Sequence, residues 1–173
     1  MKILVISDTH GWEQELESFL QPLRDQVDLI LHAGDSELQA DSSQLKDVVT
    51  VAGNCDVFSS FPSERLLEAS GLVIQLTHGH YEGVKSSLTE LAQKAQENKA
   101  TIAVYGHTHI PKVQRFGEVI TINPGSLRLP KGKYAGSYCV VDITDEAIQI
   151  NYFTMDGTAI EALEATFNRN DVS

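Results

Sequence analysis

The chain has 173 residues, 42% of them hydrophobic and 21% charged, with a formal net charge of −11. This length suits one globular domain over residues 1–173, and this composition argues against a disordered chain. The acidic charge disfavours long nucleic acid as a partner, and no apolar run approaches the ~20 residues of a membrane span.

The first third of the chain alternates short apolar runs with longer segments of mixed polarity. Three runs of strand length predict buried strands at residues 3–6, 27–32 and 48–52. Between the first two runs, apolar residues at helical spacing predict a helix over residues 12–23. Residues 36–45 suit a helix or a turn. This order of elements predicts parallel strands, because crossover helices join parallel neighbours.

The pattern changes in the second half of the chain. Residues 71–77 and 102–105 predict buried strands on either side of an amphipathic helix over residues 84–98. Four further strands joined by short turns indicate antiparallel meanders at residues 113–116, 119–122, 138–143 and 147–153. A short helix is expected over residues 161–167.

The cysteine content bears on the cellular compartment. Cys55 and Cys139 are the two cysteines of the chain, and they are far apart in sequence. Two such residues do not suggest a disulfide scaffold. We therefore expect both thiols to be reduced and the protein to be cytoplasmic.

Polar clusters directly follow five of the predicted strands. They read Asp8-Thr9-His10, Gly34-Asp35, Gly53-Asn54, His78-Gly79-His80 and Gly106-His107-Thr108-His109. The carboxyl ends of parallel strands share one edge of a sheet, and ligand sites form there. We therefore expect these five loops to converge, with the glycines allowing tight turns.

The side chains of these clusters are carboxylates, an amide and imidazoles. Such oxygen and nitrogen donors suit Mn²⁺, Fe²⁺, Ni²⁺, Co²⁺ or Zn²⁺ rather than calcium. Asp35 lies midway in the series and is the natural bridge between two ions. Two divalent ions about 3.5–4 Å apart promote displacement at phosphorus. The alternative for an isolated aspartate after a strand is a helix N-cap.

The series of clusters resembles the calcineurin-like metallophosphoesterase superfamily. The segments Gly53-Asn54-Cys55-Asp56 and Asn123-Pro124-Gly125-Ser126 resemble its small bacterial and archaeal (YfcE-like) phosphodiesterase branch. The resemblance implies an α/β fold, a four-layer sandwich of two mixed β-sheets packed face to face with helices on both outer sides. It also implies two metal sites that share Asp35: the first uses Asp8, His10, Asp35 and His109, and the second uses Asp35, Asn54, His78 and His107.

The resemblance further implies an activity. A dinuclear metal-dependent phosphoesterase, foremost a phosphodiesterase, would use in-line attack by a metal-bridging hydroxide. Its cofactors would be two divalent metal ions, with Mn²⁺ favoured over Ni²⁺, Fe²⁺, Co²⁺ and Zn²⁺. Its substrate would be a small phosphodiester or a nucleotide-like molecule, and a homo-oligomer is compatible with the family. We expect His80, Asn54 and Asp35 to be the catalytic residues.

One position departs from the superfamily pattern. Most members carry histidine after the Gly-Asn pair, where this chain has Cys55. A thiol is a weak hydrogen-bond donor compared with an imidazolium. His80 or Asp56 could replace that histidine as the proton donor, and we favour His80.

Several alternatives remain open from the sequence. The chain could be a non-catalytic protein-binding scaffold similar to the eukaryotic retromer subunit, or a nuclease or small-nucleotide hydrolase. Asn123 and Ser126 either build a turn or contact substrate. Five basic residues between Lys112 and Lys133 form either a solvated face or a patch that steers an anionic substrate. His32, inside an apolar run, is expected to be a packed core histidine.

Overall fold

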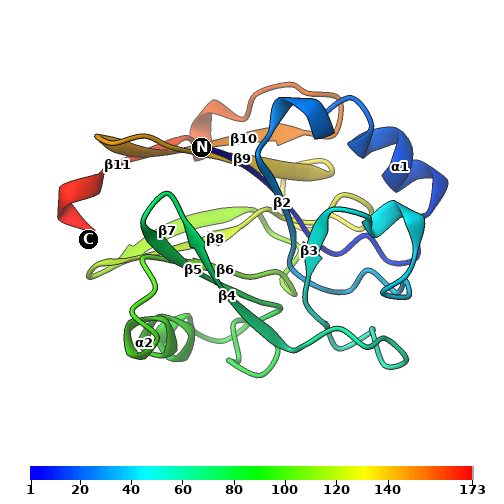
Figure 1. Cartoon of the computed structure of the whole chain (residues 1–173), viewed down its shortest axis with the longest axis horizontal. Helices are drawn as coiled ribbons and strands as arrows, with labels where there is room; N and C mark the ends of the chain where they lie inside the picture. Colours follow the sequence, from blue (N-terminus) through cyan, green and yellow to red (C-terminus); the bar gives the residue numbers. More distant parts are fainter. Residues whose placement is uncertain (173) are drawn as a thin grey trace.

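The computed structural model describes residues 1–172, in which two β-sheets pack face to face (Figure 1). The first sheet has six strands in the order β11-β10-β9-β1-β2-β3, and the second has five in the order β4-β5-β6-β8-β7. The strands of the first sheet are β1 (Lys2–Ile6), β2 (Leu29–His32), β3 (Val48–Thr50), β9 (Ser137–Ile143), β10 (Ala147–Thr154) and β11 (Ala165–Asn168). Those of the second are β4 (Glu64–Ala69), β5 (Leu72–Thr77), β6 (Ile102–Val104), β7 (Lys112–Phe116) and β8 (Val119–Asn123).

Both sheets mix parallel and antiparallel pairs. In the first sheet β1, β2 and β3 run parallel, whereas β9 pairs antiparallel with β1 and β10 with β9. In the second sheet β5, β6 and β8 run parallel, and the edge strands β4 and β7 run antiparallel to their neighbours. The expected parallel first part and the later antiparallel pairs are therefore both present.

Burial on both faces explains the uninterrupted apolar runs. In β1, Ile3 and Val5 point into the core between the sheets, while Leu4 and Ile6 point to the outer side of the first sheet. Successive side chains of a strand alternate between faces, so a strand covered on both sides needs apolar residues throughout.

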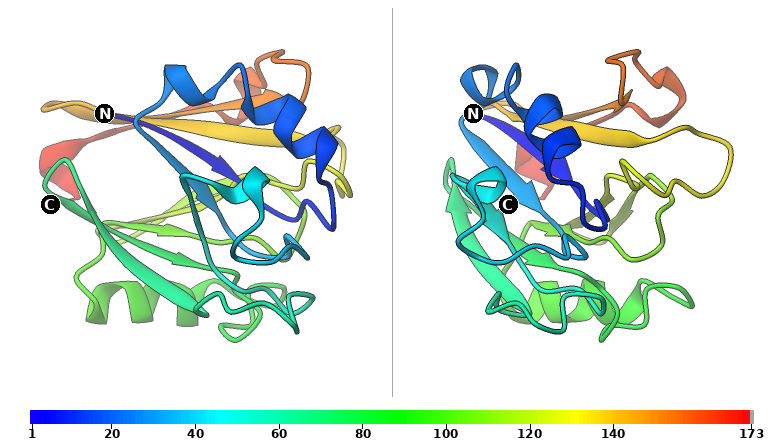
Figure 2. Two further views of the ribbon diagram at one scale, coloured as in Figure 1. Left: turned by 45° about the vertical axis from the view of Figure 1, so that its right-hand side comes forward. Right: turned by 90° about the vertical axis from the view of Figure 1, so that its right-hand side faces the viewer.

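Helices cover the outer faces, which gives four layers (Figure 2). Helix α1 (Gln14–Leu20) buries Leu16 and Leu20, one turn apart, against the outer side of the first sheet. Helix α2 (Thr89–Glu97) buries Leu91 and Ala95 against the outer side of the second sheet. Short 3₁₀ turns lie at Arg24–Gln26 (η1), Ser43–Leu45 (η2), Glu161–Leu163 (η3) and Arg169–Asp171 (η4). The four-layer α/β sandwich with two mixed sheets is thus confirmed.

Three segments have a secondary structure that differs from the one predicted from the sequence. The helix expected over residues 161–167 is wrong: η3 is followed by strand β11, whose hydrogen bonds to β10 outweigh the local helical preference. Strand β4 escapes sequence detection because it is a charged, largely exposed edge strand, as edge strands that resist aggregation often are. Residues 36–45 form turns and η2 rather than a regular helix.

Both long helices are shorter than their apolar patterns. The chain leaves α1 at Leu20, two residues before Pro22, which lacks the N–H group that a helix would need. Residues 84–88 form turns, and Ser87 Oγ accepts the backbone N–H of Thr89 at 3.1 Å at the start of α2. Within residues 1–172, none of the helices has the length and apolar character required to cross a bilayer.

Candidate metal centre

The predicted ligands come together where parallel strands of both sheets end. Asp8 and Asp35 follow β1 and β2 of the first sheet, and His78 and His107 follow β5 and β6 of the second. The loops therefore meet between two facing sheets rather than along the edge of one. This arrangement explains how residues a hundred positions apart can share one site.

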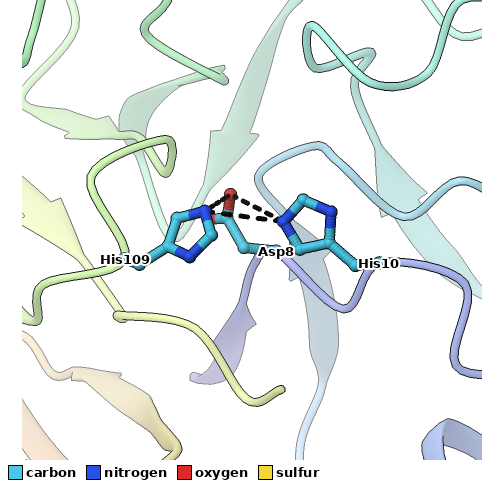
Figure 3. A group of neighbouring side chains, drawn as sticks. All are labelled: Asp8, His10 and His109. Carbon is cyan, nitrogen blue, oxygen red and sulfur yellow. Dashed lines mark hydrogen bonds and ion pairs between the residues drawn. The ribbon is translucent and has the colours of Figure 1, made fainter. Parts of the chain in front are cut away.

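Asp8, His10 and His109 form the first cluster (Figure 3). The Nε2 atom of His109 lies 3.1 Å from Asp8 Oδ1, and the Nε2 atom of His10 lies 3.9 Å from the same oxygen. The two imidazole Nε2 atoms are 3.5 Å apart. All three side chains thus direct a ligand atom into one small volume.

Asp35, His78 and His107 form the second cluster, with ligand atoms within 4.8 Å of one another. His78 Nε2 lies 3.2 Å from Asp35 Oδ2, and the His78 and His107 ring centroids are 5.0 Å apart. The side chains of Asp35 and His78 are almost completely buried. Asp35 is also within 4.8 Å of a ligand atom of His10. It therefore lies between the two clusters, where a bridging carboxylate would have to be.

Hydrogen bonds on the far side of three imidazole rings fix their orientation. His78 Nδ1 donates to the Ala33 carbonyl at 2.7 Å, and His109 Nδ1 donates to the Leu129 carbonyl at 2.7 Å. His10 Nδ1 donates to the Glu37 carboxylate at 2.6 Å. Since a carbonyl or carboxylate oxygen accepts, each Nδ1 carries the proton and each Nε2 faces the centre. Metal-binding histidines are held in this way.

The clusters leave buried acceptors without donors. Among the described residues, Asp8 Oδ1 and His78 Nε2 have no hydrogen-bond partner, although both atoms are buried. Unpaired buried polar atoms are costly and rare, and here each faces another acceptor. Divalent cations between these atoms would remove that cost. Carboxylate and imidazole donors suit Mn²⁺, Fe²⁺, Co²⁺, Ni²⁺ and Zn²⁺, so the residues present fit the metal ions that the sequence predicts.

Charge and burial shift the pKa values of these groups. The adjacent Asp8 carboxylate, which stabilises the protonated ring, raises the pKa of His109. Burial opposes protonation of His78, but the adjacent Asp35 and Asp8 carboxylates outweigh it and raise the pKa of His78. Burial alone would raise the pKa of Asp35, yet its contacts with His78 and Cys55 hold it below its usual range. Burial, together with His78 and Lys85, lowers the pKa of His107 to about 4.

The backbone of the ligand loops adopts a conformation that few residues tolerate. Asp8, His10, Asp35, His107 and His109 all have positive φ, between 43° and 65°. Non-glycine residues seldom adopt the left-handed region, and such residues gather at functional sites. The loops also touch: a Cβ added to Gly53 would overlap the Asp35 carboxylate, and one added to Gly106 would overlap the Ser7 hydroxyl.

Asp56 organises the site without belonging to either cluster. Its Oδ2 accepts the backbone N–H groups of Asp35 and Gly53, both at 2.7 Å. Its Oδ1 accepts the Glu37 N–H at 2.6 Å and the Ser36 hydroxyl at 3.2 Å. Both oxygens are thus engaged in joining the loops after β2 and β3. From the sequence, Asp56 was considered only as a proton donor, because its contacts with residues 35–37 are distant along the chain and leave no local pattern.

Asn54 and His80 lie beside the clusters, and their predicted roles stay predictions. The Asn54 amide nitrogen donates to Cys55 Sγ at 3.3 Å, and its neighbour Gly53 packs against Asp35. The His80 ring lies 5.4 Å from that of His78 and 4.0 Å from that of Tyr81. Burial and the neighbouring His78 lower the pKa of His80, so its ring is mostly neutral at pH 7.

Asn123, Ser126 and His32 all have structural roles behind the ligand loops. Asn123 donates to the Gly106 carbonyl at 2.8 Å, and the Ser126 hydroxyl donates to the Asp8 carbonyl at 2.7 Å. Both side chains are fully buried, so they support the ligand loops from behind. His32 is fully buried as well, with Nε2 2.9 Å from Thr9 Oγ1 and Nδ1 accepting the Gly34 N–H.

Cys55 borders the first cluster and both cysteines are free thiols. Its Sγ is within 4.8 Å of ligand atoms of His10 and Asp35. Burial and the Asp35 charge raise the pKa of the Cys55 thiol to about 11. The thiol is therefore protonated at pH 7.

The basic segment divides into separate surfaces. Arg128 donates to the His10 carbonyl, and the Lys131 N–H donates to the His109 carbonyl at 3.0 Å. Arg115 instead donates to the Asp171 carbonyl at 2.6 Å, at the other end of β7. Only part of the predicted patch therefore adjoins the metal clusters.

Comparison with known proteins identifies the family. Residues 1–146 match the calcineurin-like phosphoesterase superfamily domain. The chain is 37% identical over 164 residues to a probable metallophosphoesterase, YsnB, of Bacillus subtilis, covering 95% of this chain and 97% of that protein. It is 32% identical over 170 residues to the phosphodiesterase YfcE of Escherichia coli, covering 82% of this chain and 88% of that protein.

Comparison with solved structures supports the same family. A predicted phosphoesterase from Streptococcus pneumoniae superposes with a TM-score of 0.91 at 32% identity over 97% of each chain. Vacuolar protein sorting 29 of Cryptosporidium parvum, at 21% identity, shares the fold with a TM-score of 0.77 over 96% of each chain. The chain therefore belongs to the calcineurin-like phosphoesterase superfamily and is a metal-dependent phosphoesterase.

Proposed function

We propose that this protein is a dinuclear metal-dependent phosphodiesterase acting on small phosphodiesters or nucleotide-like substrates. The observation that carries the proposal is the pair of clusters around Asp35, in which buried acceptors face each other without donors. A relative that is 32% identical is named a phosphodiesterase, which supports the same reaction class. The net charge of −11 favours small substrates over long nucleic acid.

The first metal would be held by Asp8, His10, Asp35 and His109, and the second by Asp35, Asn54, His78 and His107. Mn²⁺ is the ion we favour for this mixture of oxygen and nitrogen donors. When bound, two such ions would activate a water nucleophile at neutral pH and neutralise charge on the phosphoryl oxygens. In-line attack on phosphorus then needs no serine or cysteine nucleophile.

The chain's own residues would orient the substrate and stabilise charge. Asn54, beside Asp35, would present its amide to the phosphoryl group. His80, with its ring 5.4 Å from that of His78, would contact a phosphoryl or leaving-group oxygen. The lowered pKa of His80 favours a role as a neutral hydrogen-bond donor over that of a strong acid.

The proposal also covers domain organisation, cellular compartment and oligomeric state. We propose that residues 1–173 act as one domain, that the protein works in the cytoplasm, and that it can form a homo-oligomer. The two free thiols support a reducing compartment.

A protein-binding scaffold of the same fold is the competing function, because vacuolar protein sorting 29 shares the architecture. The filled set of ligand positions around Asp35 favours catalysis here. A scaffold would take up little metal and show no turnover, which makes the two proposals separable.

The test combines metal content with turnover. Chelator-treated protein should hydrolyse bis(p-nitrophenyl) phosphate only after Mn²⁺ is restored, and faster than p-nitrophenyl phosphate. Asp35→Asn should lose metal and reduce kcat at least about a hundredfold. Asp41→Asn removes the same charge at an exposed position and should do neither. Full turnover in excess chelator would refute the proposal.

A further inference from the structure

A cavity of about 270 Å³ opens beside the metal clusters, between the loops that follow β2 and β3. Its walls include Glu37 and Leu38 from the first loop, and Cys55, Asp56 and Phe58 from the second. A larger cavity of about 840 Å³ lies along α2, but it shares no residue with the metal clusters. The smaller cavity is therefore the one that a substrate at the clusters would meet.

Two wall residues of the small cavity directly contact predicted metal ligands. Glu37 Oε1 accepts from His10 Nδ1 at 2.6 Å, and the Cys55 N–H donates to Asp35 Oδ1 at 2.7 Å. The Cys55 sulfur also lies within 4.8 Å of ligand atoms of both His10 and Asp35. A phosphoryl group held at the clusters would thus have this cavity as its immediate neighbour.

The walls combine an exposed aromatic ring with a carboxylate. Phe58 is 89% exposed, the largest fraction among the exposed large hydrophobic residues of the described chain. An exposed aromatic ring presents a flat face on which another ring can stack. Asp56 is occupied by four donors from the protein. Glu37, by contrast, has one oxygen bonded to His10 and a side chain that is 41% exposed, so it can accept a hydrogen bond from a ligand.

We propose that this cavity binds the organic group of the phosphodiester substrate, and that this group is an aromatic ring with N–H donors, such as a nucleobase. The ring would stack on Phe58, as bases stack on aromatic side chains. An N–H group of the ring would donate to Glu37. The cavity volume of about 270 Å³ suits a single ring system rather than a polymer. This inference rests on the proposed phosphodiesterase function and names its substrate class.

Three diesters with the same leaving group test the cavity. The p-nitrophenyl esters of thymidine 5′-phosphate, methyl phosphate and phosphorylcholine all release p-nitrophenol, so only the retained group differs. Wild type should prefer the thymidine ester. Phe58→Ala should lower kcat/KM for that ester about tenfold and leave the methyl ester within about twofold. Leu66→Ala, which trims an exposed apolar residue of the edge strand β4 that does not line the cavity, should change neither.

A binding measurement separates failure of the cavity from failure of the function. Titration of the Mn²⁺-loaded protein with thymidine 5′-monophosphate should give tighter binding than methyl phosphate, and Phe58→Ala should remove the difference. Phe58-dependent binding without hydrolysis of any ester would support the cavity and refute the phosphodiesterase. Hydrolysis with equal effects of Phe58→Ala on all three esters would refute the cavity alone. A preference for the choline ester that depends on Phe58 would also overturn it, since the cavity would then select a cation.

Discussion

His78 and Asp35 face each other at the centre of the site, with His78 Nε2 3.2 Å from Asp35 Oδ2. The other ring nitrogen of His78 donates to the Ala33 carbonyl at 2.7 Å. A neutral ring therefore presents a lone pair to a carboxylate, which is unfavourable until a cation lies between them. A proton or a metal ion can supply that cation, so the two compete for the same residues.

Metal affinity should consequently fall as the pH drops. The pKa values of His78 and His109 are raised above 6.5 by the neighbouring carboxylates, so protons already compete with the metal near neutral pH. Calorimetric titration of Mn²⁺ should give weaker binding at about pH 6 than at about pH 8 and should release protons into the buffer. An affinity that does not change over this range would contradict the arrangement.

Replacing Asp56 should weaken both the fold and the metal centre. Asp56→Asn puts an amide nitrogen opposite backbone N–H groups that now donate to carboxylate oxygens. We expect the free energy of unfolding to fall by about 2–4 kcal/mol, measured by urea denaturation, and Mn²⁺ affinity to fall with it. Asp41→Asn at an exposed position is the control. Unchanged stability of Asp56→Asn would show that these hydrogen bonds contribute nothing.

The close approach of two loops at Gly53 gives a steric prediction. In Gly53→Ala the new methyl group would overlap the Asp35 carboxylate and its backbone nitrogen. We expect Mn²⁺ affinity to fall at least about tenfold as Asp35 is displaced. Gly157→Ala is the matched control, because nothing lies within 4 Å of its Cβ. Its positive φ should cost about 1 kcal/mol of stability, but its metal affinity should equal that of the wild type.

Burial of His32 links stability to pH. Burial lowers the pKa of His32 from 6.5 to about 4, so between these values the unfolded chain binds a proton that the folded chain excludes. The contribution of the neutral His32 side chain to folding stability is fully present above pH 6.5 and is lost as the pH falls toward 4. Its total size is about 3 kcal/mol.

The measurement for His32 is a difference between two proteins. His32→Gln replaces the imidazole with an amide, which still offers a hydrogen-bond donor and an acceptor but does not titrate. Urea denaturation of the metal-free proteins at several pH values should show a flatter acid limb for this variant than for the wild type. Parallel pH profiles for the two proteins would contradict the depressed pKa.

Cys55 should prove dispensable for turnover of aryl esters. Its thiol has a pKa of about 11 and stays protonated at pH 7, and a thiol is a weak hydrogen-bond donor. Cys55→Ser should therefore keep kcat for bis(p-nitrophenyl) phosphate within about threefold of the wild type. A loss of a hundredfold or more would mean that the sulfur takes part directly.

The apolar runs were sufficient to predict most of the strands, and the polar clusters after them predicted the residues that gather at the strand ends; the sandwich itself was implied only by the resemblance to the family. Ile3–Ile6 is apolar at every position because both faces of β1 are covered. A strand that is buried on two faces can therefore be recognised from its uninterrupted apolar run. Strands β4 and β11 have no such apolar run. Strand β4 is charged and largely exposed, and both strands depend on pairing with a neighbouring strand.

The sequence by itself determined which donors this protein can offer to metal ions, because residue type and position after a strand are local properties. Only the tertiary structure decided how those donors are held. Asp56 reaches Asp35 across 21 positions, Glu37 reaches His10 across 27, and the Ala33 carbonyl orients His78 across 45. Such contacts form because strand pairing within the first sheet, and the packing of the second sheet against it, bring distant loops within hydrogen-bond distance. No periodicity along the chain predicts them.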